Sequence, residues 1–144
     1  MNFVESIIQT SLTKKFIQNG KGDRFSKVLL DEEISINDTE ETEIAYFVPK
    51  NSGTLTLYTT IQSNSPANGT RGRAIIKVYN ANELVSSGEI KSIQPGEQES
   101  KSFDFEVKRF NKYRIVVEQI AGTISCVGCN IYGYITDIPE TYFF

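Results

Sequence analysis

From residue 25 onward the sequence is a series of short segments rich in Ile, Val, Thr, Tyr and Phe, separated by polar turn clusters. Apolar residues recur at every second position in several of them: Ile44-Tyr46-Val48, Leu55-Leu57, Phe103-Phe105-Val107 and Tyr113-Ile115-Val117. This period places one face of each segment on a core, as in β-strands, and the regular turn spacing is typical of a β-sandwich or jelly roll. The predicted strands are 26–36, 43–48, 53–62, 72–80, 83–93, 99–108, 112–120 and 128–137.

Eight such strands suit two packed four-stranded sheets, and the intervening turns at 49–53, 66–69, 80–82 and 95–97 are rich in Pro, Gly and Asn. The predicted fold is therefore all-β: a single jelly-roll-like antiparallel β-sandwich with an N-terminal extension. A chain of 144 residues is long enough to bury a substantial core in one such domain. We assign 1–24 to an N-terminal connector arm and hinge, 25–138 to the sandwich, and 139–144 to a C-terminal aromatic tail.

The N-terminal arm is too apolar for a free tail. A hinge at 18–23, containing Gly20 and Gly22, separates it from the strands. The spacing of its apolar residues fits an amphipathic helix, but the hydroxyl residues among them fit an extended arm equally. We expect the arm either to dock on its own domain or to enter a neighbouring copy as an intersubunit connector. Its apolar residues are Phe3, Val4, Ile7, Ile8, Leu12 and Phe16.

Composition argues against several functions. The chain contains no His, which is the commonest general base and metal ligand, and no Trp. We therefore expect no enzyme and no cofactor. The net charge of -3 gives no reason to expect nucleic acid. No membrane insertion is expected, because no segment approaches a membrane span, and without a recognisable secretory signal we expect synthesis in the cytoplasm, with any display on a spore or cell surface following assembly or lysis.

Charged residues are unevenly distributed. Acidic residues gather between 31 and 43, where they could supply oxygen ligands for Ca²⁺, but a solvated edge that deters sheet pairing is the better interpretation because the spacing matches no metal loop. Basic residues gather between 101 and 114, on a predicted hairpin of 99–108 and 112–120. Lys108, Arg109 and Phe110 at its turn are candidate intersubunit contacts, where opposite charges could set the register of stacked copies.

Cys126 and Cys129 form a Cys-Val-Gly-Cys sequence, a spacing shared by redox motifs and by half of a zinc site. A zinc site needs two further ligands, and the chain has no other Cys and no His, so no metal is expected. The strand pattern that follows the pair argues against a thioredoxin-like motif, which needs a helix. Buried or edge thiols and a local or intersubunit disulfide both remain open.

The C-terminal half resembles the bacterial endospore appendage pilins. The resemblance lies in the polar turn at Pro95-Gly96, the Ser-rich approach to Phe103, the step Val107-Lys108-Arg109-Phe110, and Cys129 near the start of the last strand; Lys27-Val28-Leu29-Leu30-Asp31 also resembles that family's first core strand. It implies a jelly-roll subunit that stacks helically by edge-to-edge sheet pairing, with a flexible N-terminal connector reaching into subunits of a later turn. The chain departs from the family in lacking Cys within 1–25 and in having Leu29 where a body Cys is expected, so apolar insertion would replace the crosslink.

We predict a structural, self-assembling subunit of a fibre or pilus-like appendage, whose partners are copies of itself. Strands 26–36 and 99–137 would present edges for lateral pairing, and the arm would insert into neighbouring subunits. A head-to-tail contact builds a ring or an open helical filament, and the sequence does not choose between them. The alternative is a carbohydrate- or protein-binding β-sandwich module, including a phage or virion component, that contacts a glycan or surface receptor.

Overall fold

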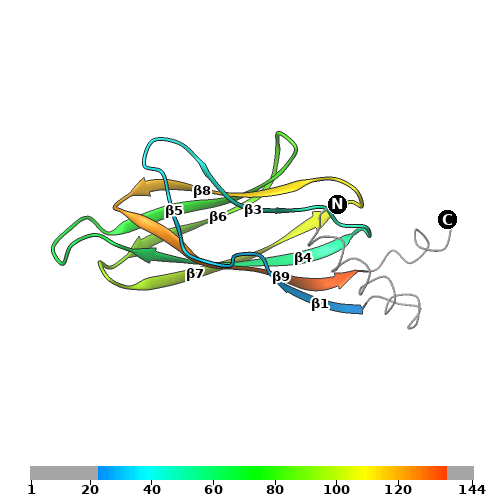
Figure 1. Cartoon of the computed structure of the whole chain (residues 1–144), viewed down its shortest axis with the longest axis horizontal. Coiled ribbons are helices and arrows are strands. Elements are labelled where there is room, and N and C mark those ends of the chain that lie inside the picture. Colours follow the sequence, from blue (N-terminus) through cyan, green and yellow to red (C-terminus); the bar gives the residue numbers. More distant parts are fainter. Residues whose placement is uncertain (1–22, 136–144) are drawn as a thin grey trace.

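The computed structural model describes residues 23–135, which form two antiparallel sheets and no helix. Sheet A has the order β1-β9-β4-β7, with the short β2 also paired to β9, and sheet B has the order β3-β8-β5-β6. The two sheets lie as lower and upper layers in Figure 1. The predicted all-β sandwich is confirmed. The strands are β1 (Asp23–Val28), β2 (Ile34–Ser35), β3 (Thr42–Phe47), β4 (Gly53–Ser63), β5 (Gly72–Asn80), β6 (Glu83–Ile93), β7 (Gln98–Val107), β8 (Tyr113–Ala121) and β9 (Ile124–Ile135).

The chain passes repeatedly from one sheet to the other. Only β5 and β6 follow each other within one sheet as a paired hairpin; β3 to β4, β4 to β5, β6 to β7, β7 to β8 and β8 to β9 all change sheets. If β1 and β2 are taken as one interrupted strand, this is the strand order of an eight-stranded jelly roll. Neighbours in space are therefore mostly distant in sequence.

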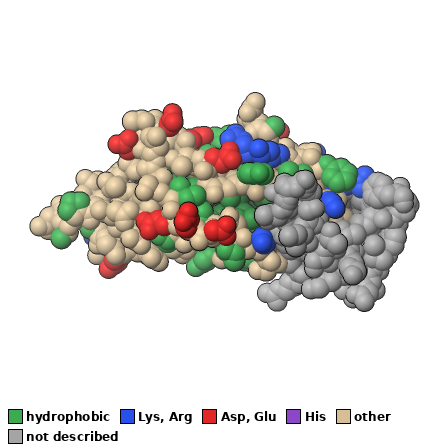
Figure 2. Space-filling model, viewed as in Figure 1, with side chains coloured by type: hydrophobic (Ala, Val, Ile, Leu, Met, Phe, Trp, Pro, Cys, Tyr) green, Lys and Arg blue, Asp and Glu red, His purple; other side chains and the backbone are tan. Residues whose placement is uncertain are grey.

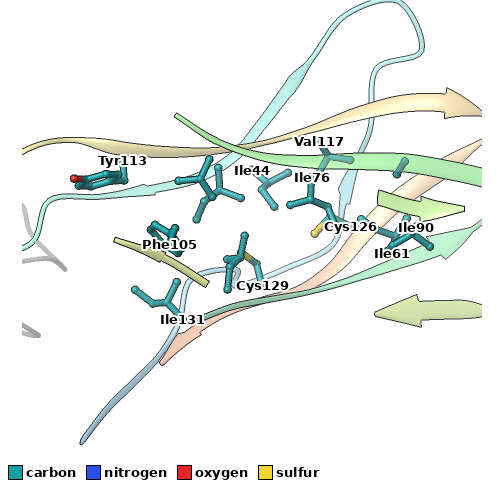
Figure 3. Close-up of a cluster of buried hydrophobic side chains, with 14 of the residues drawn as sticks. Ile44, Ile61, Ile76, Ile90, Phe105, Tyr113, Val117, Cys126, Cys129 and Ile131 are labelled. Atoms are coloured by element: carbon teal, nitrogen blue, oxygen red, sulfur yellow. The ribbon is translucent and has the colours of Figure 1, made fainter. Parts of the chain in front are cut away.

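The core fills the space between the layers. The alternation predicted for β4 and β8 is confirmed, because Leu55, Leu57, Tyr113, Ile115 and Val117 are all at most 1% exposed. At one end of the core an aromatic cluster brings Tyr113 within 5.6 Å of Phe47 and 6.1 Å of Phe105, measured between ring centroids. Figure 3 shows Tyr113 and Phe105 at this end, and Cys126 and Cys129 among aliphatic side chains further along.

Two segments of the structure differ from the predicted strands because the hydrogen-bonded pairing of the strands is irregular there. The segment 26–36 is not one strand but two, β1 and β2, both paired to β9 and separated by the acidic stretch 29–33. In β3, a register shift between Glu43 and Ala45 changes which side chains face the core. Ile44 and Phe47 are buried, whereas Tyr46, predicted to face the core, is 45% exposed. A β-bulge of this kind interrupts the period of two that the prediction assumed.

The predicted hairpin of 99–108 and 112–120 is wrong. The strand β7 pairs with β4 in sheet A, and β8 pairs with β3 and β5 in sheet B. The turn at 108–112 therefore crosses between the layers. The last strand also begins at Ile124 rather than 128. The hairpin prediction failed because strand partners are chosen by burial across the whole sandwich, which a local pattern does not report.

Candidate assembly site

The two long sides of the sandwich differ. On one side the edge strands β6 and β7 lie against each other. Ser86 Oγ donates a hydrogen bond to the Asp104 carbonyl oxygen at 3.2 Å, and a Cβ atom added at Gly88 would lie 2.7 Å from Phe103 Cδ2. The backbone of β6 therefore packs directly on a β7 side chain, and this side is closed.

On the opposite side a groove separates the other two edge strands, β1 and β3. It has a volume of about 390 Å³. Among the described residues β1 pairs only with β9 and β3 only with β8. Each strand thus has one edge whose backbone groups are available for a further strand. The groove is lined by Lys27, Val28, Leu29, Asp31, Glu43, Ile44, Ala45 and Tyr46.

The groove combines apolar walls with a charged rim. Leu29 and Ala45 pack against the core and are only partly buried, and Val28 and Tyr46 are 58% and 45% exposed. Glu43 at the rim lies 3.3 Å from Arg114 Nη1. Figure 2 shows green apolar patches between the two layers, with acidic side chains both above and below them and a group of basic side chains above them. An apolar segment with a polar flank fits this lining.

The predicted contact residues Lys108, Arg109 and Phe110 form the turn between β7 and β8. The Lys108 amide donates to the buried Tyr113 hydroxyl at 2.7 Å, and the Phe110 amide donates to the Pro49 carbonyl at 2.5 Å. Phe110 has a positive φ of 68° and is 59% exposed. The Arg109 guanidinium lies 4.8 Å from the Phe110 ring centroid. The turn is thus anchored to the core while it holds an aromatic ring in solvent, in a backbone conformation uncommon for a bulky residue.

The two thiols lie inside the sandwich. Cys126 and Cys129 are free, and each is 0% exposed. Three residues apart in a regular strand they would face opposite sides, but the ladder with β4 shifts register between Thr60 and Ile61, so Val127 is extra and both thiols face the core. Burial raises the pKa of Cys126 to about 11 and of Cys129 to about 12. Such thiols are poor nucleophiles.

A disulfide at these positions conflicts with this geometry. Residues three apart in an extended strand have Cα atoms roughly 10 Å apart, a bulge shortens this only in part, and a disulfide needs 4.4–6.8 Å. A bond to another subunit would require one of two fully covered sulfur atoms to reach the surface. The described fold accommodates the thiols as apolar core residues.

The remaining predicted site residues lie outside the described part of the chain. These are the arm residues Phe3, Val4, Ile7, Ile8, Leu12 and Phe16 and the hinge residues Gly20 and Gly22. The first described residue, Asp23, already pairs with Ile135 in sheet A. The arm therefore joins the sandwich at β1, the strand that forms one wall of the groove.

Three of the seven acidic residues between 31 and 43, namely Glu33, Glu41 and Glu43, contact side chains of the sheets. Glu41 accepts hydrogen bonds from Lys77 Nζ at 2.6 Å and from Tyr79 Oη at 2.9 Å, and Glu33 accepts one from Ser125 Oγ. Within 23–135 no group of three or more Asp, Glu, Cys or His residues has the geometry of a metal site. The same residues include no helix with the length and hydropathy of a membrane span.

Comparison with known proteins identifies the fold alone. Neither a protein-family sequence model nor the sequence of any curated protein matches the chain. Among solved structures, latent PorU from Porphyromonas gingivalis matches with a TM-score of 0.58 and 9% identity over 81% of this chain. The VP2 subviral particle of infectious bursal disease virus matches with a TM-score of 0.53 and 10% identity over 83%. This chain spans 13% of the PorU chain and 34% of the VP2 chain.

The expected likeness to endospore appendage pilins is present and weak. A disulfide-linked pilus of Bacillus endospore appendages matches with a TM-score of 0.48 and 15% identity, over 82% of this chain and 92% of that chain. These values do not place the chain in that family.

Two features of the surface escaped sequence reasoning. The groove is formed by β1 and β3, which lie in different sheets, and Tyr46 lines it because of the bulge in β3. The acidic residues that precede β3 did indicate that β3 is an edge strand, because charged residues often protect sheet edges from unwanted pairing. The outward-facing tyrosines of sheet A, Tyr58 and Tyr132, were also missed as individual residues.

Proposed function

We propose that this chain is a non-enzymatic structural subunit that assembles with copies of itself into a fibre or pilus-like appendage. The observation that carries the proposal is the open side of the sandwich, where two unpaired strand edges flank a groove with apolar walls. The fold supports it, since a sandwich of this kind is found in the VP2 subviral particle. Display on a spore or cell surface belongs to the same proposal.

The arm of a neighbouring subunit is the occupant that suits the groove. A strand added to a sheet edge gains main-chain hydrogen bonds, and its alternate side chains fill pockets beneath it. The arm carries six large apolar residues, and burying each such side chain fully contributes about 1.5–3 kcal/mol. These contacts offset part of the conformational entropy lost when the arm is ordered, which is about 1–2 kcal/mol per residue, and the main-chain hydrogen bonds of the added strand must supply the rest.

Of the segments predicted to pair edge to edge between subunits, 26–36 and 99–137, only some form edge strands in the structure. The described edges are β1 with β2 and β7 in sheet A, and β3 and β6 in sheet B; β8 and β9 are interior strands. Because β6 and β7 cover each other, the free edges concentrate at β1 and β3. Edge-to-edge pairing between subunits and insertion of the arm would therefore both use the side of the sandwich formed by β1 and β3.

The decisive experiment compares the full chain with a variant lacking residues 1–17. We expect the full chain to form larger species as its concentration rises, measured by light scattering after size exclusion, with filaments or rings in negative-stain images. The truncated chain should remain monomeric. Assembly of the truncated chain at the same concentrations would remove the arm from the mechanism, and a full chain that stays monomeric throughout would refute the proposal.

A groove variant tests where the arm binds. Ala45→Arg places a charge on the apolar wall of the groove and should abolish assembly. Ser87→Arg places the same charge on an exposed position of β6, on the closed side, and should leave assembly unchanged. Equal assembly of the two variants would show that the groove is not the receiving site.

A further inference from the structure

The outer face of sheet A, away from both the groove and the core, carries a row of hydrogen-bonding side chains. On the central strand β4 the outward residues are Thr54, Thr56, Tyr58, Thr60 and Gln62, and the outward residues of the adjoining β7 are Gln98, Ser100, Ser102, Asp104 and Glu106. Nine residues of β4 span about 27 Å at the usual rise per residue. This row is a long and strongly hydrophilic surface.

Cross-strand hydrogen bonds hold the polar groups of the row in fixed positions. Thr56 Oγ1 donates to Asp104 Oδ1 at 2.7 Å, and the hydroxyls of Thr60 and Ser100 lie 2.8 Å apart. Further along, Gln98 Nε2 donates to Gln62 Oε1 at 3.1 Å. Groups already oriented by their neighbours lose little further entropy when they bind a ligand.

Two tyrosines interrupt the polar row at one place. Tyr58 lies opposite Asn130 of β9, and Tyr132 of β9 lies opposite Thr56, so the two rings are diagonal neighbours on one face. Tyr58 is 40% exposed and Tyr132 is 37% exposed. Neither side chain contributes to the core, which lies on the opposite face of the sheet. The pair forms an aromatic platform inside a field of hydroxyl, amide and carboxylate groups.

We propose that this row, centred on Tyr58 and Tyr132, binds a linear neutral glycan. A sugar ring presents an apolar face of C–H groups, which packs on an aromatic ring, and a rim of hydroxyls that both donate and accept hydrogen bonds. The row supplies both kinds of partner, because Tyr and Asn donate and accept whereas Asp104 only accepts. A row of this length on an open sheet face matches an extended chain of sugars rather than a single sugar in a pocket.

Charge and composition select this ligand over others. The described side chains of the row include the carboxylates of Asp104 and Glu106, which oppose an anionic glycan. Single-stranded nucleic acid stacks on aromatic rings too, but it requires a positively charged track. Protein interfaces are depleted in Ser, Asp and Glu, and the row contains Ser100, Ser102, Asp104 and Glu106. The row lies on the face of sheet A opposite the core, and neither Tyr58 nor Tyr132 lines the groove, so binding and assembly can be measured separately.

The proposal is tested by titrating the full chain with hexasaccharides of glucose and of N-acetylglucosamine, followed by calorimetry and by amide chemical shifts. We expect at least one of these probes to bind. Tyr58→Ala and Tyr132→Ala should each weaken that binding at least tenfold, whereas Tyr58→Phe, which keeps the ring, should retain it within about threefold. The control Leu84→Ala removes an exposed apolar side chain from β6, which lies in the other sheet and outside the groove, and should bind as the unmodified chain does.

A charged probe tests the role of the carboxylate. A galacturonic acid hexasaccharide should bind at least tenfold more weakly than the best neutral probe, and Asp104→Asn should narrow that difference. The same samples are examined by light scattering, so that a loss of assembly is measured separately. Absence of binding at millimolar neutral probe, equal binding by the alanine variants, or assembly that fails in the tyrosine variants would overturn the proposal. The last result would show that the row contacts another subunit.

Discussion

Gly133 is held in a conformation that other residues rarely adopt. Its φ is +149°, and a Cβ atom added there would lie 2.6 Å from the Thr54 carbonyl oxygen and 3.1 Å from Leu55 Cα. Both contacts are with the backbone of β4, which cannot rotate away. The pairing of β9 with β4 therefore requires glycine at this position.

Replacing Gly133 by Ala should lower the free energy of unfolding by about 2 kcal/mol or more, since a strained backbone conformation alone costs about 1–3 kcal/mol. Thermal and denaturant unfolding measure the change. Gly128→Ala is the matched control in the same strand, because its added Cβ would lie 3.6 Å from Thr60, an ordinary contact. Equal stability of the two variants would contradict this account of the ladder.

The buried thiols predict a pH dependence in the alkaline range. Burial raises the pKa of Cys126 from 9.0 to about 11 and that of Cys129 to about 12. Between pH 9 and about pH 11–12 the two thiols lose their protons in the unfolded chain but keep them in the folded chain. The contribution of the thiols to the free energy of unfolding is therefore fully present below pH 9 and falls as the pH rises through this range. Cys126 alone would contribute about 3 kcal/mol to the loss.

The test measures unfolding free energy from pH 8 to pH 11 in the native chain and in a Cys126→Ala, Cys129→Ala double variant. The double variant should be less stable at pH 8 and should show a smaller decline with pH. Alkylation supplies a second readout: both thiols should react only after denaturation. Rapid labelling of either thiol in the folded chain would show that the sandwich opens.

At the scale of elements, Lys77 of β5 joins the acidic segment before β3 to sheet B. Its Nζ lies 2.6 Å from Glu41 Oε2 and 2.7 Å from Glu118 Oε1. The hydrogen bond to Glu118, followed by that to Glu41, raises the pKa of Lys77, and the same Lys77 contact lowers the pKa of Glu41. The three charges fix the approach of the chain to the edge strand β3.

Removing the central charge should have a modest effect. Lys77→Met is expected to lower stability by about 1 kcal/mol, since exposed ion pairs contribute about 0–1 kcal/mol each. The difference from the native chain should shrink in 1 M salt, where the screening length is about 3 Å. Lys91→Met, at an exposed position of β6, should change stability less. A salt-independent loss in Lys77→Met would indicate lost packing instead of lost charge.

At the scale of the whole molecule, assembly and stability should be linked. In the proposed assembly, subunits would bind one another only when folded, so association would raise the apparent melting temperature as concentration increases. The full chain should therefore melt at a higher temperature when concentrated, and the variant lacking residues 1–17 should melt at a constant temperature. Scanning calorimetry over a hundredfold range of concentration measures both. A rise of equal size in the two chains would assign the association to the sandwich alone.

The two long sides of the sandwich differ, so they offer different surfaces to a neighbouring molecule. The closed side, where β6 covers β7, offers little backbone for pairing, whereas the side between β1 and β3 is open. The basic turn with Phe110 lies at one end of the sandwich, where β7 and β8 meet. A subunit with one receptive side and one distinctive end suits a head-to-tail contact, which yields a ring or an open helix.

The sequence alone determined the fold class and most strand positions, because a period of two and turn residues are local properties of the chain. It also determined that Leu55, Leu57, Tyr113, Ile115 and Val117 would be buried, since they lie in uninterrupted stretches of that period. The sequence did not predict which way the side chains of Tyr46, Cys126 and Cys129 face, because a bulge in each of these strand pairs changes which side chains point to the core. A bulge depends on the partner strand.

Only the tertiary structure decided which strands are neighbours. The pairing of β7 with β4 and of β8 with β3 and β5 joins segments far apart in the sequence, and it replaced the local hairpin that the pattern suggested. The tyrosine platform follows from the pairing of β9 with β4, and the groove follows from the places of β1 and β3 at the edges of the two sheets. Local propensity fixes what each segment becomes, whereas burial of both sheets in one core fixes where it lies.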